Sequence, residues 1–94
     1  MSDLEIIKTI TTKYLDTKAN RAFIFGSRAT GQASKYSDYD LGIDGQKLKS
    51  ELYFELISAF EESDLHVKVD VVDFNNVSEV FRTNAMQSII PLTF

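Results

Sequence analysis

The sequence predicts an α+β fold (a two-layer α/β arrangement) in which a small mixed β-sheet carries helices on one face. Segments with apolar residues at helical spacing alternate along the chain with short apolar or alternating segments. Two of the predicted strands alternate apolar and polar residues, so each buries one face and exposes the other. A ligand would therefore bind on the open side of the sheet. Residues 1–94 are expected to form a single domain, since no repeat or linker interrupts them.

The first half of the chain predicts one helix and two strands. The helix spans residues 3–17, where a capping-box pattern precedes apolar residues at helical spacing. The apolar run 22–25 predicts a buried strand that ends at Gly26. Alternation with a period of two over 38–44 predicts a second strand, which Gly45 ends.

The second half predicts a helix, a strand and a further helix. Residues 47–62 place large apolar side chains four residues apart, as in an amphipathic helix. Alternation over 66–74 predicts the third strand, and a capping-box pattern at Asn76 opens a helix through about Gln87. The C-terminal six residues are either a short edge strand or a disordered end, because Pro91 cannot lie in the centre of a sheet.

Composition and charge argue against several classes of function. The chain has no cysteine and only one histidine, His66, which excludes a disulfide framework and a thiolate zinc site and argues against a histidine metal site. A formal net charge of −4 argues against direct binding of nucleic acid. No apolar run can span a bilayer, and the N-terminus lacks the basic region of a signal peptide, so we expect a cytoplasmic protein without membrane contact.

The first candidate site follows the first predicted strand. A glycine at Gly26 lets the main chain approach a ligand, and the Ser27 hydroxyl together with main-chain N–H groups can hold phosphate oxygens. Taken alone, this pair favours a simple turn. The next residue, Arg28, can either contact a phosphate through its guanidinium or lie in solvent, and the sequence leaves both interpretations open.

The second candidate site consists of three aspartates. Asp38 and Asp40 lie two residues apart on one strand, so they project from the same face with Cα atoms roughly 6.6–7 Å apart. Asp70 lies on the polar face of the third predicted strand, and joins them if the two strands are neighbours. Like charges on one strand face are unfavourable without a ligand. Carboxylates without His or Cys form a hard, oxygen-only set that suits Mg²⁺ or Mn²⁺.

Three neighbouring residues have structural interpretations. Asp44 and Asp73 are predicted to be turn residues, because each lies where a strand ends. Tyr39, between the two acidic positions, is expected to face the helices.

These residues resemble the signature of the DNA polymerase β-like nucleotidyltransferase superfamily. Gly26-Ser27 is followed after ten residues by Asp38-Tyr39-Asp40, and a third Asp lies on a later strand. More narrowly, GSRATG, SDYDLGID and VDVVD resemble the minimal nucleotidyltransferases (MNT domain), small proteins often encoded beside a HEPN-domain protein as a toxin–antitoxin pair. The resemblance covers roughly residues 5–90 and implies the palm fold of the superfamily; Pro91 departs from its apolar last strand.

The resemblance implies a role for each matching residue. Gly26 and Ser27 would hold the β- and γ-phosphates of a nucleoside triphosphate, with ATP as the donor. Asp38 and Asp40 would ligate two Mg²⁺ ions. Asp70 would ligate the metal on the attacking side and help to activate the incoming hydroxyl. The implied reaction is an in-line attack on the α-phosphorus with pyrophosphate leaving.

We therefore predict a Mg²⁺-dependent nucleotidyltransferase that transfers AMP from ATP to a hydroxyl. The resemblance implies that this hydroxyl belongs to a tyrosine of a HEPN toxin encoded nearby, so that the chain acts as an antitoxin in a homo- or hetero-oligomer. The short chain leaves no room for an acceptor-binding domain, so a separate molecule must present the hydroxyl. Two alternatives remain: a catalytically silent antitoxin that blocks its partner by steric contact, and transfer to a small molecule such as an aminoglycoside.

Overall fold

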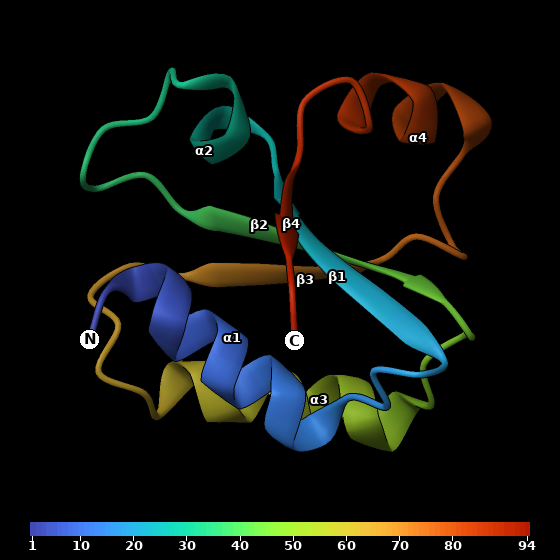
Figure 1. The fold of residues 1–94 in the computed structure, drawn as a ribbon, viewed down its shortest axis with the longest axis horizontal. Helices are drawn as coiled ribbons and strands as arrows, with labels where there is room; N and C mark the ends of the chain where they lie inside the picture. The colour runs from blue at the N-terminus through green and yellow to red at the C-terminus, as the bar shows by residue number, and fades with distance from the viewer.

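The computed structural model describes residues 1–94 and contains one mixed sheet with helices on both faces (Figure 1). The elements follow in the order α1 (Asp3–Tyr14), β1 (Asn20–Phe25), α2 (Ser27–Thr30), β2 (Tyr39–Gly45), α3 (Ser50–Glu61), β3 (Val69–Asp73), α4 (Glu79–Ala85) and β4 (Ile90–Leu92). The four strands lie in the order β3-β2-β1-β4. Only β2 and β3 are parallel; the other pairs are antiparallel. The predicted α+β fold with a small mixed sheet is confirmed.

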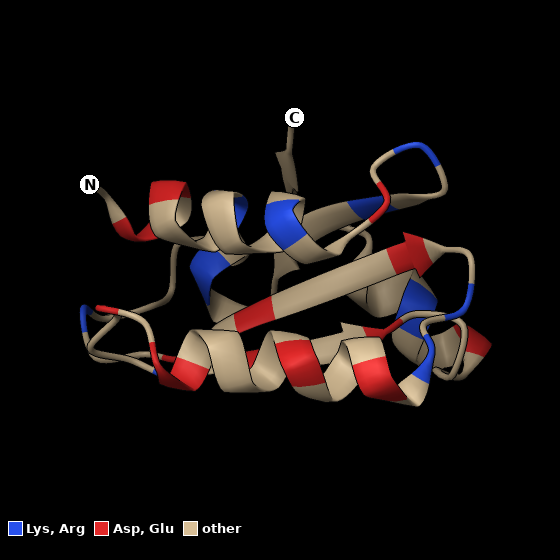
Figure 2. Cartoon of the chain, turned by 90° about the horizontal axis from the view of Figure 1, so that it is seen from below, with Lys and Arg blue, Asp and Glu red and all other residues tan.

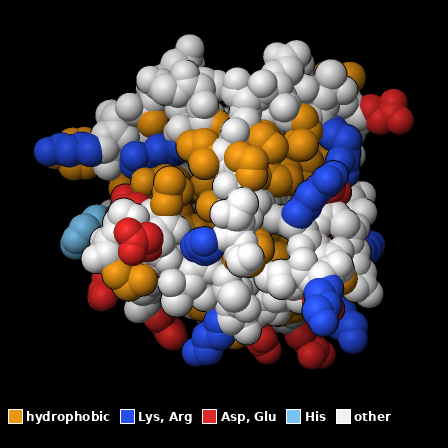
Figure 3. Space-filling view, in the orientation of Figure 1, with side chains coloured by type: hydrophobic (Ala, Val, Ile, Leu, Met, Phe, Trp, Pro, Cys, Tyr) orange, Lys and Arg blue, Asp and Glu red, His pale blue; other side chains and the backbone are white.

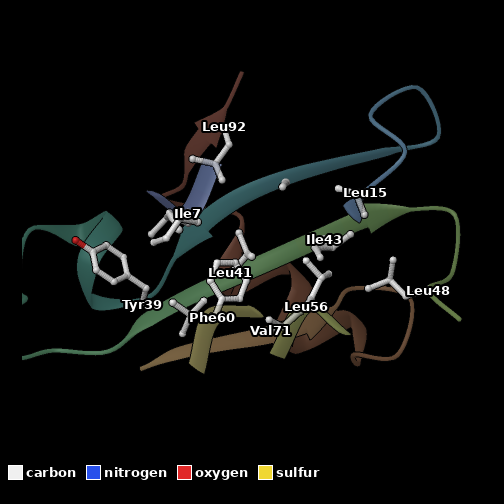
Figure 4. Packing of buried hydrophobic residues seen from close by; sticks show 13 residues of the cluster. Ile7, Leu15, Tyr39, Leu41, Ile43, Leu48, Leu56, Phe60, Val71 and Leu92 are labelled. Atoms are coloured by element: carbon white, nitrogen blue, oxygen red, sulfur yellow. The ribbon is translucent and has the colours of Figure 1, made fainter. Parts of the chain in front are cut away.

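The main hydrophobic core lies between the sheet and the layer formed by α1 and α3. The parallel pair β2 and β3 requires a crossover connection, and α3 provides it across one face of the sheet. Ile7 of α1 and Leu56 of α3 are completely buried against Leu41 and Ile43 of β2 (Figure 4). The apolar face predicted for the second strand is therefore the face that these two helices cover.

The opposite face is not fully open, which corrects the expectation that helices cover one face alone. Phe23 and Phe25 of β1 form a second buried cluster with Phe74, and residues of α4 pack against it. The ring of Phe74 meets those of Phe23 and Phe25 nearly edge-on, with centroids 4.9 and 5.2 Å apart. A Cβ at Gly42 would overlap the Phe23 ring and lie 2.8 Å from Phe74 Cε1, so this cluster requires a strand residue without a side chain. Figure 1 shows α2 and α4 above the sheet, on the side away from α1 and α3.

The structure moves the ends of several predicted elements. β1 begins at residue 20 rather than 22, and β2 spans 39–45 rather than 38–44. The first helix ends at residue 14 instead of 17, where the Leu15 N–H still donates to the Thr11 carbonyl. The second predicted helix, α3, spans residues 50–61 rather than 47–62, and the third predicted strand, β3, spans residues 69–73 rather than 66–74. Leu48 lies before α3, yet it is buried and its N–H donates to Asp73 Oδ2 at 3.1 Å. Apolar residues thus continue the core beyond the hydrogen-bonded elements, which is why periodicity overestimates the lengths of these two helices and of the third strand.

Two local features differ from what the sequence predicts, and a third decides between two alternatives that the sequence leaves open. The segment after Gly26, predicted as a turn, forms the short helix α2. The last helix begins after Ser78, whose Oγ accepts a hydrogen bond from the Phe81 N–H at 3.1 Å, so the predicted cap at Asn76 is wrong by two residues. The C-terminal segment forms the edge strand β4, with Pro91 opposite Phe23 of β1.

Charged residues are spread unevenly over the elements. Figure 2 shows acidic residues, all of them Glu, in succession along α3, while Lys and Arg are dispersed over several elements. None of the helices is both long enough and apolar enough to cross a membrane.

Candidate functional site

At the end of β1, Gly26 lies so close to the Asp40 carboxylate that a side chain on Gly26 would occupy the same space. Gly26 has φ 72° and ψ −152°, a conformation that side chains disfavour strongly. A Cβ built on it would overlap Asp40 Oδ2 and lie 3.2 Å from Asp40 Cγ. The antiparallel register of β1 and β2, which places Phe25 opposite Asp40, produces this approach. The structure thus brings together the start of the predicted phosphate-binding turn and one predicted metal ligand.

Asp70 lies directly beside Asp40 in the sheet. The parallel register of β2 and β3 pairs these two residues, and both are half-buried. The pKa of Asp40 is raised, first by burial and then by the negative charges of Asp70 and Asp38. Lys68 offsets part of this charge, since its Nζ lies 3.1 Å from Asp70 Oδ1. The two acidic strands are therefore neighbours, as the predicted grouping of Asp70 with Asp40 requires.

Asp38 lies just outside the sheet and is exposed. Its charge acts on Asp40, but no three or more His, Cys, Asp or Glu side chains are arranged to hold one metal ion. The three predicted carboxylates are therefore near one another without forming a ready-made ligand set. The donor chemistry nevertheless fits Mg²⁺ or Mn²⁺, because carboxylate oxygens are hard ligands and a cation would relieve the repulsion that raises the pKa of Asp40.

Ser27 and Arg28 begin α2, immediately after Gly26. Ser27 is half-buried and directly follows Gly26, which lies against the Asp40 carboxylate. Arg28 has protein partners: Nη2 donates to the carbonyls of Ser37 at 2.7 Å and Lys35 at 3.2 Å. Phosphate binding by Ser27 and Arg28 stays a prediction.

The contacts of Arg28 also fix the loop that leads to Asp38. The guanidinium carbon lies 4.2 Å from the centre of the Tyr39 ring, in a cation–π arrangement. Tyr39 is buried among the residues of the main core, and its hydroxyl donates to Asp3 Oδ2 at 3.0 Å, so its predicted orientation toward the helices is confirmed. Arg28 therefore acts as a positioning residue. The sequence pattern does not reveal this role, because its hydrogen-bond partners are main-chain carbonyls.

Asp44 is not the simple turn residue that the sequence predicts. Its carboxylate is buried and accepts two hydrogen bonds from Arg82 of α4, at 2.9 and 3.0 Å, and one from Arg21 of β1 at 2.9 Å. The hydrogen bonds from Arg82, ahead of those from Arg21 and Gly45, hold the pKa of Asp44 well below its usual range. Arg82 and Asp44 thus fasten α4 to the sheet.

Asp73, by contrast, is confirmed as a turn residue, since its Oδ1 accepts a hydrogen bond from the Asn75 N–H at 3.0 Å.

Asp44→Asn is expected to lower the free energy of unfolding by about 1–3 kcal/mol at pH 7, because Arg82 and Arg21 lose a charged partner. The folded-state pKa of Asp44 lies below its unfolded value, so this contribution is present above about pH 4 and is lost as the pH falls. Urea unfolding at pH 7 and at pH 2–4 measures both effects. The control, Asp64→Asn on an exposed residue, should change stability by less than about 0.5 kcal/mol. Equal losses in the two variants would contradict the prediction.

A cavity of about 350 Å³ lies between α2 and α4 and includes Gly26 in its wall. None of its other lining residues was singled out by the sequence, because they come from β1, α2, α4 and the segment after α4. Two larger hollows, of about 580 and 720 Å³, border α3 and contain none of the predicted site residues. The cavity at Gly26, rather than either larger hollow, therefore adjoins the Asp40 carboxylate.

Comparisons with known proteins point to one family. Residues 5–93 match the family described as polymerase beta, nucleotidyltransferase. Over 81 residues the chain is 41% identical to the "Probable protein adenylyltransferase MntA" of Haemophilus influenzae, covering 85% of this chain and 69% of that protein. A solved toxin–antitoxin structure with AMP-PNP superposes with a TM-score of 0.78 at 22% identity, covering 98% of this chain and 73% of that one. A complex of tri-AMPylated Shewanella oneidensis HEPN toxin with MNT antitoxin gives 0.64 at 22% identity, covering 96% and 71%. At such identity the two structures show likeness of fold, whereas the family match and the Haemophilus relative support the conclusion that this chain belongs to the polymerase beta nucleotidyltransferase family.

Proposed function

We propose that this chain is a Mg²⁺-dependent protein adenylyltransferase that transfers AMP from ATP to a tyrosine of a HEPN toxin and acts as its antitoxin. The observation that carries the proposal is the space shared by Gly26 and the Asp40 carboxylate, with Asp70 beside it. Gly26 has no side chain, so phosphates can approach its main chain, and the acidic oxygens beside it can bind divalent cations. The names of the relatives support AMP as the transferred group and a HEPN toxin as the acceptor.

The proposal gives each of these residues a role. The main chain at Gly26 and the Ser27 hydroxyl hold the β- and γ-phosphates, while Asp38, Asp40 and Asp70 hold two divalent ions. Bound Mg²⁺ supplies charge neutralisation for the α-phosphate and the leaving pyrophosphate. Asp70, on the neighbouring strand, orients the incoming tyrosine hydroxyl and accepts a hydrogen bond from it. Arg28 keeps Asp38 within reach by holding the preceding loop.

The proposal is tested by incubating the purified chain with Mg²⁺, the HEPN protein encoded nearby and each of the four ribonucleoside triphosphates, labelled at the α-phosphate. We expect label on the HEPN protein with ATP, and an increase in its mass by whole AMP units. A HEPN protein whose modified tyrosine is changed to Phe is the matched control and should stay unlabelled. Absence of transfer from every donor would overturn the proposal. Neutralisation of the toxin by an Asp38→Asn/Asp40→Asn/Asp70→Asn chain would instead favour the silent, steric antitoxin.

Mg²⁺ or Mn²⁺ is expected to raise the melting temperature of the chain. A cation that binds only the folded state stabilises it by about 2.7 kcal/mol at 100 times its dissociation constant, which corresponds to roughly 10–20 °C for a domain of this size. Thermal unfolding at increasing concentrations of either ion measures the rise. It should be absent from Asp38→Asn/Asp40→Asn and retained in Asp64→Asn. An equal rise in all three proteins would show that the ion binds elsewhere.

A further inference from the structure

The cavity between α2 and α4 begins where the predicted phosphate site ends. Figure 3, which keeps the orientation of Figure 1 with α2 and α4 at the top, shows hydrophobic side chains gathered near the middle of the view. The residues that matter here come from both sides of the cavity: Phe25, Gly26, Thr30, Phe81, Asn84 and Gln87. Because Gly26 belongs to the cavity wall and also adjoins Asp40, a nucleotide whose phosphates lie at Gly26 has this hollow within reach.

We infer that this cavity binds the nucleoside part of the donor nucleotide and selects adenine. The inference rests on the proposed function and adds to it the part of the chain that recognises the base. At about 350 Å³, the cavity falls in the range of small-molecule sites and is large enough for a base with its ribose. Its wall combines aromatic and apolar side chains with a few polar groups, as is usual in such sites.

Phe81 provides a surface on which the base stacks. Phe81 as a residue is 41% exposed, while its ring packs against those of Phe25 and Phe74, each with a centroid distance of 5.9 Å. The contact with Phe25 is edge-on at 83°, which fixes the orientation of the ring. An aromatic ring held in this way can stack on any base, so Phe81 contributes to affinity more than to selectivity.

Asn84 and Gln87 provide the selectivity. Both side chains are exposed, so their amides are available to a ligand. An amide offers one donor and one acceptor side by side, which matches the N6 amino group and N7 of adenine. Guanine presents two acceptors on the same edge and pairs best with Arg or Lys, and no charged side chain lines the cavity. The wall therefore suits adenine better than guanine.

The rigidity of α4 makes this wall a preformed one. Arg82, on the same helix as Phe81 and Asn84, is held by the Asp44 carboxylate and also donates to the Phe74 carbonyl at 2.9 Å. The Ser78 hydroxyl caps the start of the helix beside Phe81. Binding sites held by such contacts lose little conformational freedom when a ligand enters.

The test measures binding of ATP, GTP and base-free tripolyphosphate, each with Mg²⁺, by calorimetry. We expect the wild-type chain to bind ATP more tightly than either of the other two. Asn84→Ala and Gln87→Ala should each lower the ATP-to-GTP affinity ratio about tenfold, and leave tripolyphosphate binding unchanged. Phe81→Ala should weaken the binding of both ATP and GTP. Gln46→Ala, an exposed amide outside the cavity, is the matched control and should behave as wild type.

Two results would overturn the inference while the proposed function stands: equal affinity of the wild type for ATP and tripolyphosphate, or unchanged ATP affinity and ATP-to-GTP ratio in all three cavity variants. If the wild type binds no nucleotide and transfers none, the proposed function fails and this inference fails with it. Since Phe81 packs in a buried cluster, its variant is checked for folding first. The decision rests on the exposed residues Asn84 and Gln87, whose replacement leaves the core untouched.

Discussion

Asp38→Asn/Asp40→Asn is expected to lower the rate of AMP transfer at least about 1,000-fold while the chain still folds. Asn keeps the shape of the side chain but removes the charge needed to hold divalent ions and to stabilise the developing charge of the reaction. The free energy of unfolding should not decrease. Burial and the charges of Asp70 and Asp38 raise the pKa of Asp40, so its ionised carboxylate opposes folding at neutral pH.

Initial rates of transfer from labelled ATP measure the loss, and urea unfolding measures the stability. Asp64→Asn, which changes an exposed acid outside the predicted site, is the control and should keep both the activity and the stability of the wild type. Full activity in the double variant would sink the proposed function. A stability well below that of the wild type would contradict the electrostatic account of Asp40.

Gly26→Ala is expected to lower transfer by about 100-fold or more. The added Cβ would overlap Asp40 Oδ2, so the carboxylate must move, and a shift of about 1 Å in a reacting group can reduce a rate about 100-fold. The conformation of Gly26, with φ 72° and ψ −152°, adds backbone strain of about 1–3 kcal/mol for a residue with a side chain.

Gly31→Ala separates the effect of backbone strain from the effect of the contact with Asp40. Gly31 has φ 79°, so the replacement also strains the backbone by about 1–2 kcal/mol, but nothing lies within 4 Å of the added Cβ. We expect Gly31→Ala to lose stability yet keep activity. If both variants lose activity in proportion to their stability, the contact with Asp40 does not matter for catalysis. Rates measured at a temperature where both variants are folded decide between the two outcomes.

Much of the predicted site follows from local patterns. Asp40 lies between the buried residues Tyr39 and Leu41, which is enough to assign it to the side of the strand away from the core, and Asp38, predicted on the same side, lies just before the strand. The same alternation assigns Asp70 to the polar face of its strand. What the pattern could not tell is that β2 and β3 are neighbours in parallel register, which places Asp70 beside Asp40. Nor could it tell that the three carboxylates stop short of a ready-made metal site, because that depends on side-chain positions in the folded chain.

The sequence by itself determined the fold class, the main helices and strands, and the candidate residues, because helical and strand periodicities depend on neighbours within a few positions. Only the tertiary structure decided which face α4 covers, how Asp44 is held and where a nucleoside can lie. Arg82 and Asp44 are 38 residues apart, and the cavity wall joins Gly26 to Asn84. Contacts of this kind arise from the packing of whole elements against one another, and no local pattern encodes them.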